Sequence, residues 1–134
     1  MNDRIDIKLI RSLSQKKYRD ETGLFVAEGE KMVQEALNSP FNVVSVIHKE
    51  EAGEKIMSRI SMMSSPSPCL AVIGKPSDSE ISDEKIHEYV AGHGLYLALD
   101  SIRGPGNLGT ISRTADWFGI DAVFASPDTV DIFN

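Results

Sequence analysis

Asn107 and Arg113 are the residues whose types and spacing best fit chemistry on a polar or anionic ligand. They follow an apolar run at residues 95–99, which predicts a buried strand. A loop is expected at 100–107 and a helix at 108–118, and the backbone N–H groups at such a helix start can face an anion. In this setting Asn107 can cap the helix and face a ligand. Arg113, a permanent cation, can hold a phosphate or orient an attacking hydroxyl.

The glycines of this loop permit a second interpretation, a dinucleotide-binding site. Gly104, Gly106 and Gly109 fit the pattern G-x-G-x-x-G, and Asp128 lies 19 residues beyond the last of them. Two details disfavour it. Four residues separate the expected strand from Gly104, whereas that motif turns at once, and Pro105 stiffens the turn.

A purely structural interpretation is open as well. Asn107 would then serve only as a helix cap, and Arg113 would form only a surface pair with Asp116. Residue types and spacing do not by themselves separate this interpretation from a ligand site.

Length and composition are typical of a soluble globular protein, and we expect it in the cytoplasm. The chain has 134 residues, of which 41% are hydrophobic and 25% charged. No apolar run approaches the ~20 residues that span a bilayer, and the N-terminus lacks the apolar core of a signal peptide, so no membrane association is expected. The single cysteine, Cys69, excludes an internal disulfide and a cysteine-built metal site, and no metal is expected.

Charge is unevenly distributed along the chain. The net charge of −6 argues against extensive non-specific binding of nucleic acid. Residues 1–19, however, carry six basic and only two acidic side chains. A basic end on an acidic body is either a phosphate-contacting patch or a solvated helix face.

Strands alternate with helices along the whole chain, which is the α/β signature. A polar stretch at 76–92 predicts a connector, so residues 1–92 and 93–134 are expected to form separate parts. Helices are predicted at 4–19, 29–37, 50–62, 84–90 and 108–118, and strands at 24–27, 41–47, 69–73, 95–99 and 122–125.

The segment 100–119 resembles the first signature motif of the SpoU (TrmH-type) RNA ribose methyltransferases. That motif is approximately D-x-x-x-x-P-x-N-x-G-x-x-x-R-T-A-x-x-F-G. Residues 126–134 are similar to the segment that follows it in the family, and residues 17–31, 35–37 and 68–72 are similar to the family's substrate-binding domain. The motif positions that match are Asp100, Pro105, Asn107, Gly109, Arg113, Thr114, Ala115, Phe118 and Gly119.

The resemblance implies a two-part α/β fold. Residues 1–92 would form a three-layer α/β/α domain like that of RNA-binding ribosomal proteins. Residues 93–134 would form the first β-α-β of a knotted, SPOUT-type methyltransferase domain. The implied partner is RNA, either rRNA or tRNA, and the implied assembly of the full-length protein is a homodimer.

The resemblance also implies roles for individual residues. Arg113 matches the arginine that activates the ribose 2′-hydroxyl, and Asn107 matches the asparagine that positions this arginine and the substrate. Lys16, Lys17 and Arg19 become candidates for contacts with RNA phosphates. The implied reaction transfers a methyl group from S-adenosylmethionine to a ribose 2′-oxygen, which requires orientation and a placed base or cation.

The later family motifs, which form most of the cofactor pocket, do not occur in this sequence. We therefore expect an N-terminal fragment that is inactive alone and binds S-adenosylmethionine poorly, and its cofactor-binding residues stay unassigned. The alternatives are a stand-alone RNA-binding module without catalysis and a dinucleotide-binding fragment.

Overall fold

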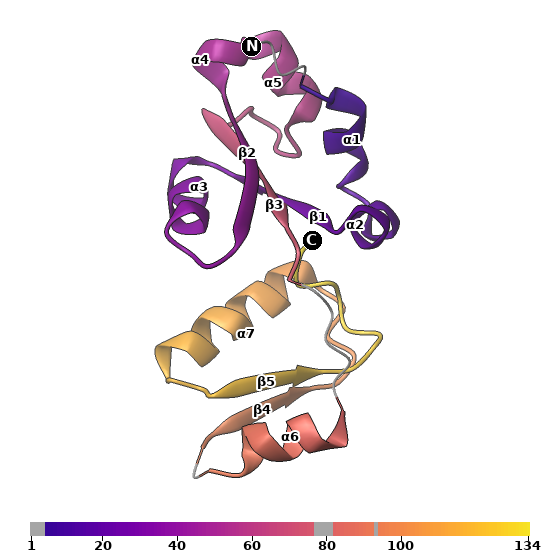
Figure 1. The fold of residues 1–134 in the computed structure, drawn as a ribbon, viewed down its shortest axis with the longest axis vertical. Coiled ribbons are helices and arrows are strands. Elements are labelled where there is room, and N and C mark those ends of the chain that lie inside the picture. The colour runs from indigo at the N-terminus through magenta and orange to yellow at the C-terminus, as the bar shows by residue number, and fades with distance from the viewer. Residues whose placement is uncertain (1–4, 77–81, 93) are drawn as a thin grey trace. The chain divides into compact units, whose positions relative to one another are not determined.

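The chain divides into two compact units, shown in Figure 1. The division falls after residue 77, at the start of the predicted connector 76–92, so the connector's helix groups with the second unit. The predicted boundary at 92/93 lies fifteen residues later. The structure is a computed structural model that describes residues 5–76, 82–92 and 94–134. Residues 1–4, 77–81 and 93 lie outside the described residues; residue 4 falls in the predicted N-terminal helix and residues 77–81 in the predicted connector.

The first unit is built around a three-stranded antiparallel sheet in the order β1-β3-β2. The side chains of the central strand alternate between two hydrophobic clusters, as a period of two requires. Leu70 and Val72 belong to one cluster, and Ala71 and Ile73 belong to the other. The strands are β1 Leu24–Glu28, β2 Asn42–His48 and β3 Cys69–Gly74.

Helices cover both faces of this sheet, and the predicted three-layer α/β/α arrangement is confirmed (Figure 1). On one face α3 buries Val33 and Ala36. On the other face α1 and α5 contribute Ile10, Met57 and Ile60 to the larger cluster. The helices of this unit are α1 Ile7–Ser12, α2 Lys16–Thr22, α3 Glu30–Leu37, α4 Lys49–Ala52 and α5 Glu54–Ile60.

Two predicted helices are each divided in two. The helix predicted at 4–19 breaks at Leu13, which is buried in the core while serine hydroxyls on either side donate to nearby backbone carbonyls. Such local hydrogen bonds compete with continuation of a helix. The helix predicted at 50–62 breaks at Gly53, whose φ of +87° a helix cannot contain.

The second unit contains the predicted β-α-β. Strands β4 Tyr96–Leu99 and β5 Ala122–Ala125 pair in parallel, and α7 Pro105–Trp117 connects them. Leu108 and Ala115 are the buried side chains of α7. The preceding helix, α6 Asp83–Val90, lies close to the predicted 84–90.

Helix α7 begins three residues earlier than predicted. Pro105 is its first residue and Gly104 is its N-cap, so the loop covers 100–104 and Asn107 lies inside the first turn. The prediction that Asn107 caps this helix is therefore wrong. Proline suits the first helical position because its φ is already helical and the N–H it lacks would have no partner there.

Candidate functional site

A hydrogen-bonded network joins the two segments that leave the carboxyl ends of β4 and β5. The Ser101 backbone N–H donates to Ser126 Oγ at 2.8 Å, and the Ser126 hydroxyl donates to Asp128 Oδ1 at 2.7 Å. The Ser101 hydroxyl donates to Asp128 Oδ2, and Arg103 lies 3.5 Å from the same oxygen. Ligands of α/β proteins bind outside the carboxyl ends of parallel strands. The network therefore fixes the backbone where a ligand is expected.

Ser101 and Asp128 are both affected by this network. Ser101 has a φ of +55°, a left-handed conformation that is uncommon outside glycine and concentrates at functional sites. The Ser101 hydroxyl, and next the Ser126 hydroxyl, lower the pKa of Asp128 by donating to its carboxylate. The dinucleotide interpretation requires the Asp128 carboxylate to bind a ribose. Because this carboxylate already accepts hydrogen bonds from two serine hydroxyls, it is a poor partner for a ribose.

The start of α7 presents open backbone and an exposed amide. The Asn107 side chain is exposed, and its Nδ2 would lie 3.2 Å from a Cβ added at Gly104. Glycine at the N-cap therefore leaves room for this amide. A Cβ added at Gly106 or Gly109 would meet nothing within 4 Å, so a ligand can approach the helix backbone closely there.

Arg113 is exposed further along α7. Six residues correspond to about 9 Å of rise and about 240° of rotation, so Asn107 and Arg113 leave the helix on different faces. Among the described residues Arg113 forms no ion pair, and the surface pair with Asp116 is not present. An exposed guanidinium without such a partner is suited to bind a phosphate.

The lysines predicted to contact phosphates have different surroundings in the first unit. Lys16 forms an ion pair with Asp20 at 2.6 Å. Lys17 is exposed, and its Nζ lies 5.6 Å from the centre of the Tyr18 ring. Of the two, Lys17 is the more available to an incoming anion.

Arg19 is buried, with 3% of its surface exposed. Its Nη1 donates to the Leu13 carbonyl at 3.0 Å, at the turn between α1 and α2, where a helix end leaves carbonyls without helical partners. The burial of Arg19 disfavours the prediction that it contacts phosphates. Its guanidinium stabilises this turn, and sequence spacing could not show that α2 turns Arg19 inward.

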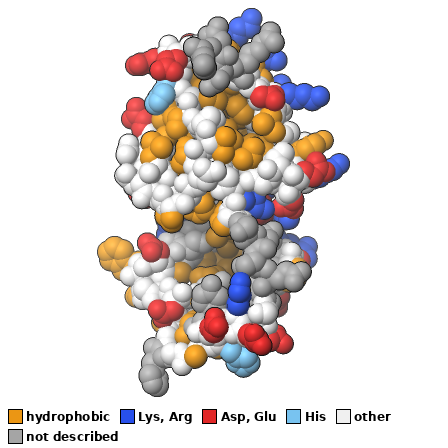
Figure 2. Space-filling model, viewed as in Figure 1, with side chains coloured by type: hydrophobic (Ala, Val, Ile, Leu, Met, Phe, Trp, Pro, Cys, Tyr) orange, Lys and Arg blue, Asp and Glu red, His pale blue; other side chains and the backbone are white. Residues whose placement is uncertain are grey.

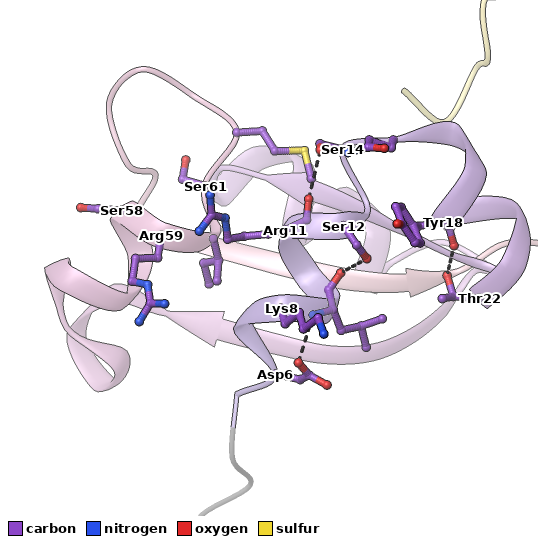
Figure 3. A pocket seen from close by; sticks show the side chains of 14 residues that line it. Asp6, Lys8, Arg11, Ser12, Ser14, Tyr18, Thr22, Ser58, Arg59 and Ser61 are labelled. Carbon is purple, nitrogen blue, oxygen red and sulfur yellow. Dashed lines mark hydrogen bonds between the residues drawn. The ribbon is translucent and has the colours of Figure 1, made fainter.

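A basic groove lies between α1, α2 and α5, with a volume of about 1010 Å³ (Figure 3). We call it the α1–α5 groove. Lys8 and Arg11 of α1, Tyr18 of α2, and Ser58 and Arg59 of α5 line it. Figure 2 shows Lys and Arg side chains along the edge of the first unit where Figure 1 places α1 and α2, with acidic side chains among them.

Sequence reasoning missed Arg59 as a member of this cluster. Arg59 lies far along the chain from the basic residues 1–19, and packing of α5 against α1 brings the two segments together. The only available signal was a basic residue on the polar face of a predicted helix, which is too common to single it out.

Neither a metal site nor a membrane-spanning helix is found in the described part of the chain. No group of three or more His, Cys, Asp and Glu residues there could hold a metal ion. No described helix is both long and apolar enough to cross a membrane.

The fold and site together define an α/β/α domain followed by a β-α-β unit with an exposed arginine beyond its loop. Residues 4–72 match the family of the MRM3-like substrate binding domain. The chain is 32% identical over 143 aligned positions to the 23S rRNA (guanosine(2553)-2′-O)-methyltransferase RlmP of Bacillus subtilis (strain 168), covering 96% of this chain and 54% of that protein.

Solved structures agree with this relationship. A protein assigned to the TrmH family of RNA methyltransferases, from Porphyromonas gingivalis, superposes with a TM-score of 0.79 at 32% identity, over 99% of this chain and 55% of its own. An AdoMet-bound rRNA methyltransferase from Sinorhizobium meliloti gives 0.79 at 30%, with the same coverage. The chain belongs to the TrmH (SpoU) RNA methyltransferase family, and it spans about half the length of these relatives.

Proposed function

We propose that this chain supplies the RNA-recognition domain and the first catalytic motif of a ribose 2′-O-methyltransferase. Its substrate would be rRNA or tRNA, its methyl donor S-adenosylmethionine, and its full-length assembly a homodimer. Arg113 carries the proposal: it is exposed and forms no ion pair among the described residues. It also lies on the helix that starts at the carboxyl edge of the parallel strands. Membership of the family supports the proposal.

In this proposal Arg113 acts on the ribose hydroxyl. A ribose hydroxyl is weakly acidic, and a guanidinium beside it favours its deprotonated form while also holding the adjacent phosphate. Asn107, at the start of the same helix, orients the nucleotide through its amide. S-adenosylmethionine supplies an electrophilic methyl group, and transfer depends on holding the 2′-oxygen in line with it.

The described residues do not by themselves form a site that fits this cofactor. A cavity of about 350 Å³ beside α7 is lined by apolar side chains such as Leu95, Leu97 and Phe118, together with Thr110 and Thr114, whose hydroxyls donate to carbonyls of the helix. Among the described residues no charged side chain lines it to meet the carboxylate and ammonium of the cofactor. We therefore propose that the chain alone binds S-adenosylmethionine weakly.

A chimera tests the catalytic part of this proposal. The chain is joined to the portion of the B. subtilis relative that it does not cover, and methyl transfer to unmodified rRNA is followed with radiolabelled S-adenosylmethionine. Arg113→Ala is compared with Arg113→Lys, and Lys85→Ala serves as the control because it removes an exposed cation of α6 that lies outside the Ser101–Asp128 network.

We expect Arg113→Ala to lower kcat by about 100-fold or more, the usual contribution of a group acting on proton transfer. RNA affinity should change by less than about fivefold, since one phosphate contact is only one of several. Full activity of Arg113→Ala, or an equal loss in the Lys85 control, would remove Arg113 from this role.

A second candidate function is RNA binding without catalysis. The match of residues 4–72 to a substrate binding domain and the basic groove favour it. Binding of the chain alone to RNA should then weaken linearly with log salt. Absence of binding at low salt would contradict both this function and the RNA-recognition part of the first.

A further inference from the structure

The described residues of the α1–α5 groove concentrate positive charge. Lys8 and Arg11 are three residues apart on α1 and share a face, while Arg59 lies on α5 across the groove (Figure 3). None of the three forms an ion pair among the described residues. Asp6 is the only acid among the described residues of the lining, and its carboxylate accepts a hydrogen bond from the Leu9 N–H as the cap of α1. A chain of net charge −6 thus presents a locally cationic groove.

Serine hydroxyls in the groove are arranged as acceptors. The Ser14 hydroxyl donates to the Arg11 carbonyl at 3.0 Å, and the Ser58 hydroxyl donates to the Glu54 carbonyl at 2.7 Å. Their protons are therefore in use, and the exposed oxygens retain lone pairs. Such oxygens complement a ligand that carries hydroxyl or N–H donors as well as phosphates.

Tyr18 adds an aromatic surface to the same groove. Its ring is half-buried, and the Lys17 ammonium lies 5.6 Å from the ring centre. An accessible aromatic ring beside cations is the combination on which an unpaired base stacks while its phosphates are neutralised.

We propose that the α1–α5 groove binds single-stranded RNA. Arg11, Arg59 and Lys8 contact successive phosphates, Tyr18 stacks on an unpaired base, and the Ser14 and Ser58 oxygens accept from ribose 2′-hydroxyls. The 2′-hydroxyl is the donor that RNA has and DNA lacks, so the groove prefers RNA. This inference rests on the proposed role of the chain in RNA recognition and locates that role in one groove.

Fluorescence anisotropy with a labelled, unstructured RNA 12-mer, and with DNA of the same sequence, tests the groove. The binding constant of the full chain is measured from 25 to 250 mM salt. Arg11→Gln combined with Arg59→Gln removes two groove cations. Lys31→Gln combined with Lys49→Gln removes two cations that line a different cavity of the same unit, with the same change in net charge.

We expect the groove variant to lose at least tenfold in affinity at 100 mM salt. The slope of log affinity against log salt should fall by about 1.4, since each phosphate contact on a single strand contributes about 0.7. The control pair should lose less than about threefold. Wild type should bind the RNA more tightly than the DNA.

Tyr18 is tested without relying on charge. Tyr18→Phe keeps an aromatic ring and should bind as wild type does, whereas Tyr18→Leu should lose about fivefold or more, the lower range for one base stack. Unfolding midpoints of both variants show whether the fold is retained. Equal affinity of Tyr18→Leu and Tyr18→Phe would remove the stacking role.

The outcomes separate the groove from the broader proposal. If wild type binds RNA and the groove variant matches the control pair, the groove assignment is overturned while RNA recognition stands. If DNA binds as tightly as RNA, the role of the serine oxygens is overturned. If wild type binds neither nucleic acid at low salt, RNA recognition fails and the groove fails with it.

Discussion

Neighbouring residues of like charge have opposite roles in this molecule. Lys17 and Arg19 lie two positions apart on α2, yet Lys17 is exposed and Arg19 is buried against the Leu13 carbonyl. A basic stretch read from the sequence therefore overstates the number of side chains available to RNA. Only the direction in which each helix position faces decides which cations are available.

The buried arginine leads to a stability difference between matched variants. Arg19→Gln shortens the side chain and leaves the Leu13 carbonyl without its donor, so we expect a loss of about 1–3 kcal/mol in the free energy of unfolding. Lys17→Gln changes an exposed side chain and should stay within about 0.5 kcal/mol of wild type. Urea denaturation measures both, and equal midpoints would contradict the role given to Arg19.

Asp128 should make the loop before α7 sensitive to acid. Its pKa is lowered in the folded protein, so its contribution to stability is present above the ordinary value of 3.8 and is lost as the pH falls below it. We expect the amide protection factor of Ser101 to decrease on acidification through this range in wild type. Asp128→Asn should show low protection at every pH, and Asp116→Asn should behave as wild type does. Hydrogen exchange followed by NMR decides between these patterns.

At the scale of elements, most helices and strands could be predicted and their ends could not. All five strands lie within a few residues of their predictions, because apolar runs with Val and Ile specify buried strands. The breaks at Leu13 and Gly53 were missed, since the apolar spacing continues across both and only backbone geometry interrupts the helix. Antiparallel pairing in the first sheet was also not predictable from the alternation of elements.

Two glycines should respond in opposite directions to alanine. Gly53 has a φ of +87° and a ψ of 157° with open space around it, a conformation nearly confined to glycine, so Gly53→Ala should cost about 1–3 kcal/mol through backbone strain alone. Gly109 lies inside α7, also with open space, so Gly109→Ala should stabilise its unit by about 0.5–1 kcal/mol. Urea unfolding followed through the NMR signals of each unit measures both changes. The same sign for both would contradict the assigned backbone conformations.

An ionic contact ties α2 to the end of β3. The Asp20 carboxylate accepts from Lys16 at 2.6 Å and from Lys75 at 2.9 Å, and these hydrogen bonds lower its pKa from 3.8 to about 2. A lowered folded pKa means that this stabilisation is complete above about pH 4 and is lost as the pH falls towards 2. Asp20→Asn should therefore flatten the fall in thermal midpoint between pH 4 and pH 2. If the thermal midpoint of Asp20→Asn falls as much as that of wild type, groups other than Asp20 cause the fall.

For the molecule as a whole, the local motif predicted the structure of its segment, whereas the distribution of charge along the chain did not predict the groove. The strand, loop and helix around Asn107 and Arg113 lie in one stretch of sequence, so the resemblance and the structure agree on them. The α1–α5 groove is lined by residues from two distant segments of the first unit, 6–22 and 58–62. It forms because α5 packs against α1 and so places Arg59 opposite Arg11. A cluster that forms when distant segments pack together leaves no local pattern, so a single sequence does not predict it.

The chemical identity of the product tests the central proposal most directly. RNA treated with the chimera and S-adenosylmethionine is digested to nucleosides, and the methylated species is identified by mass spectrometry. We expect a nucleoside whose added methyl group fragments with the ribose, and loss of this species in Arg113→Ala. A methyl group on the base, or an undiminished ribose-methylated species in Arg113→Ala, would contradict the proposal.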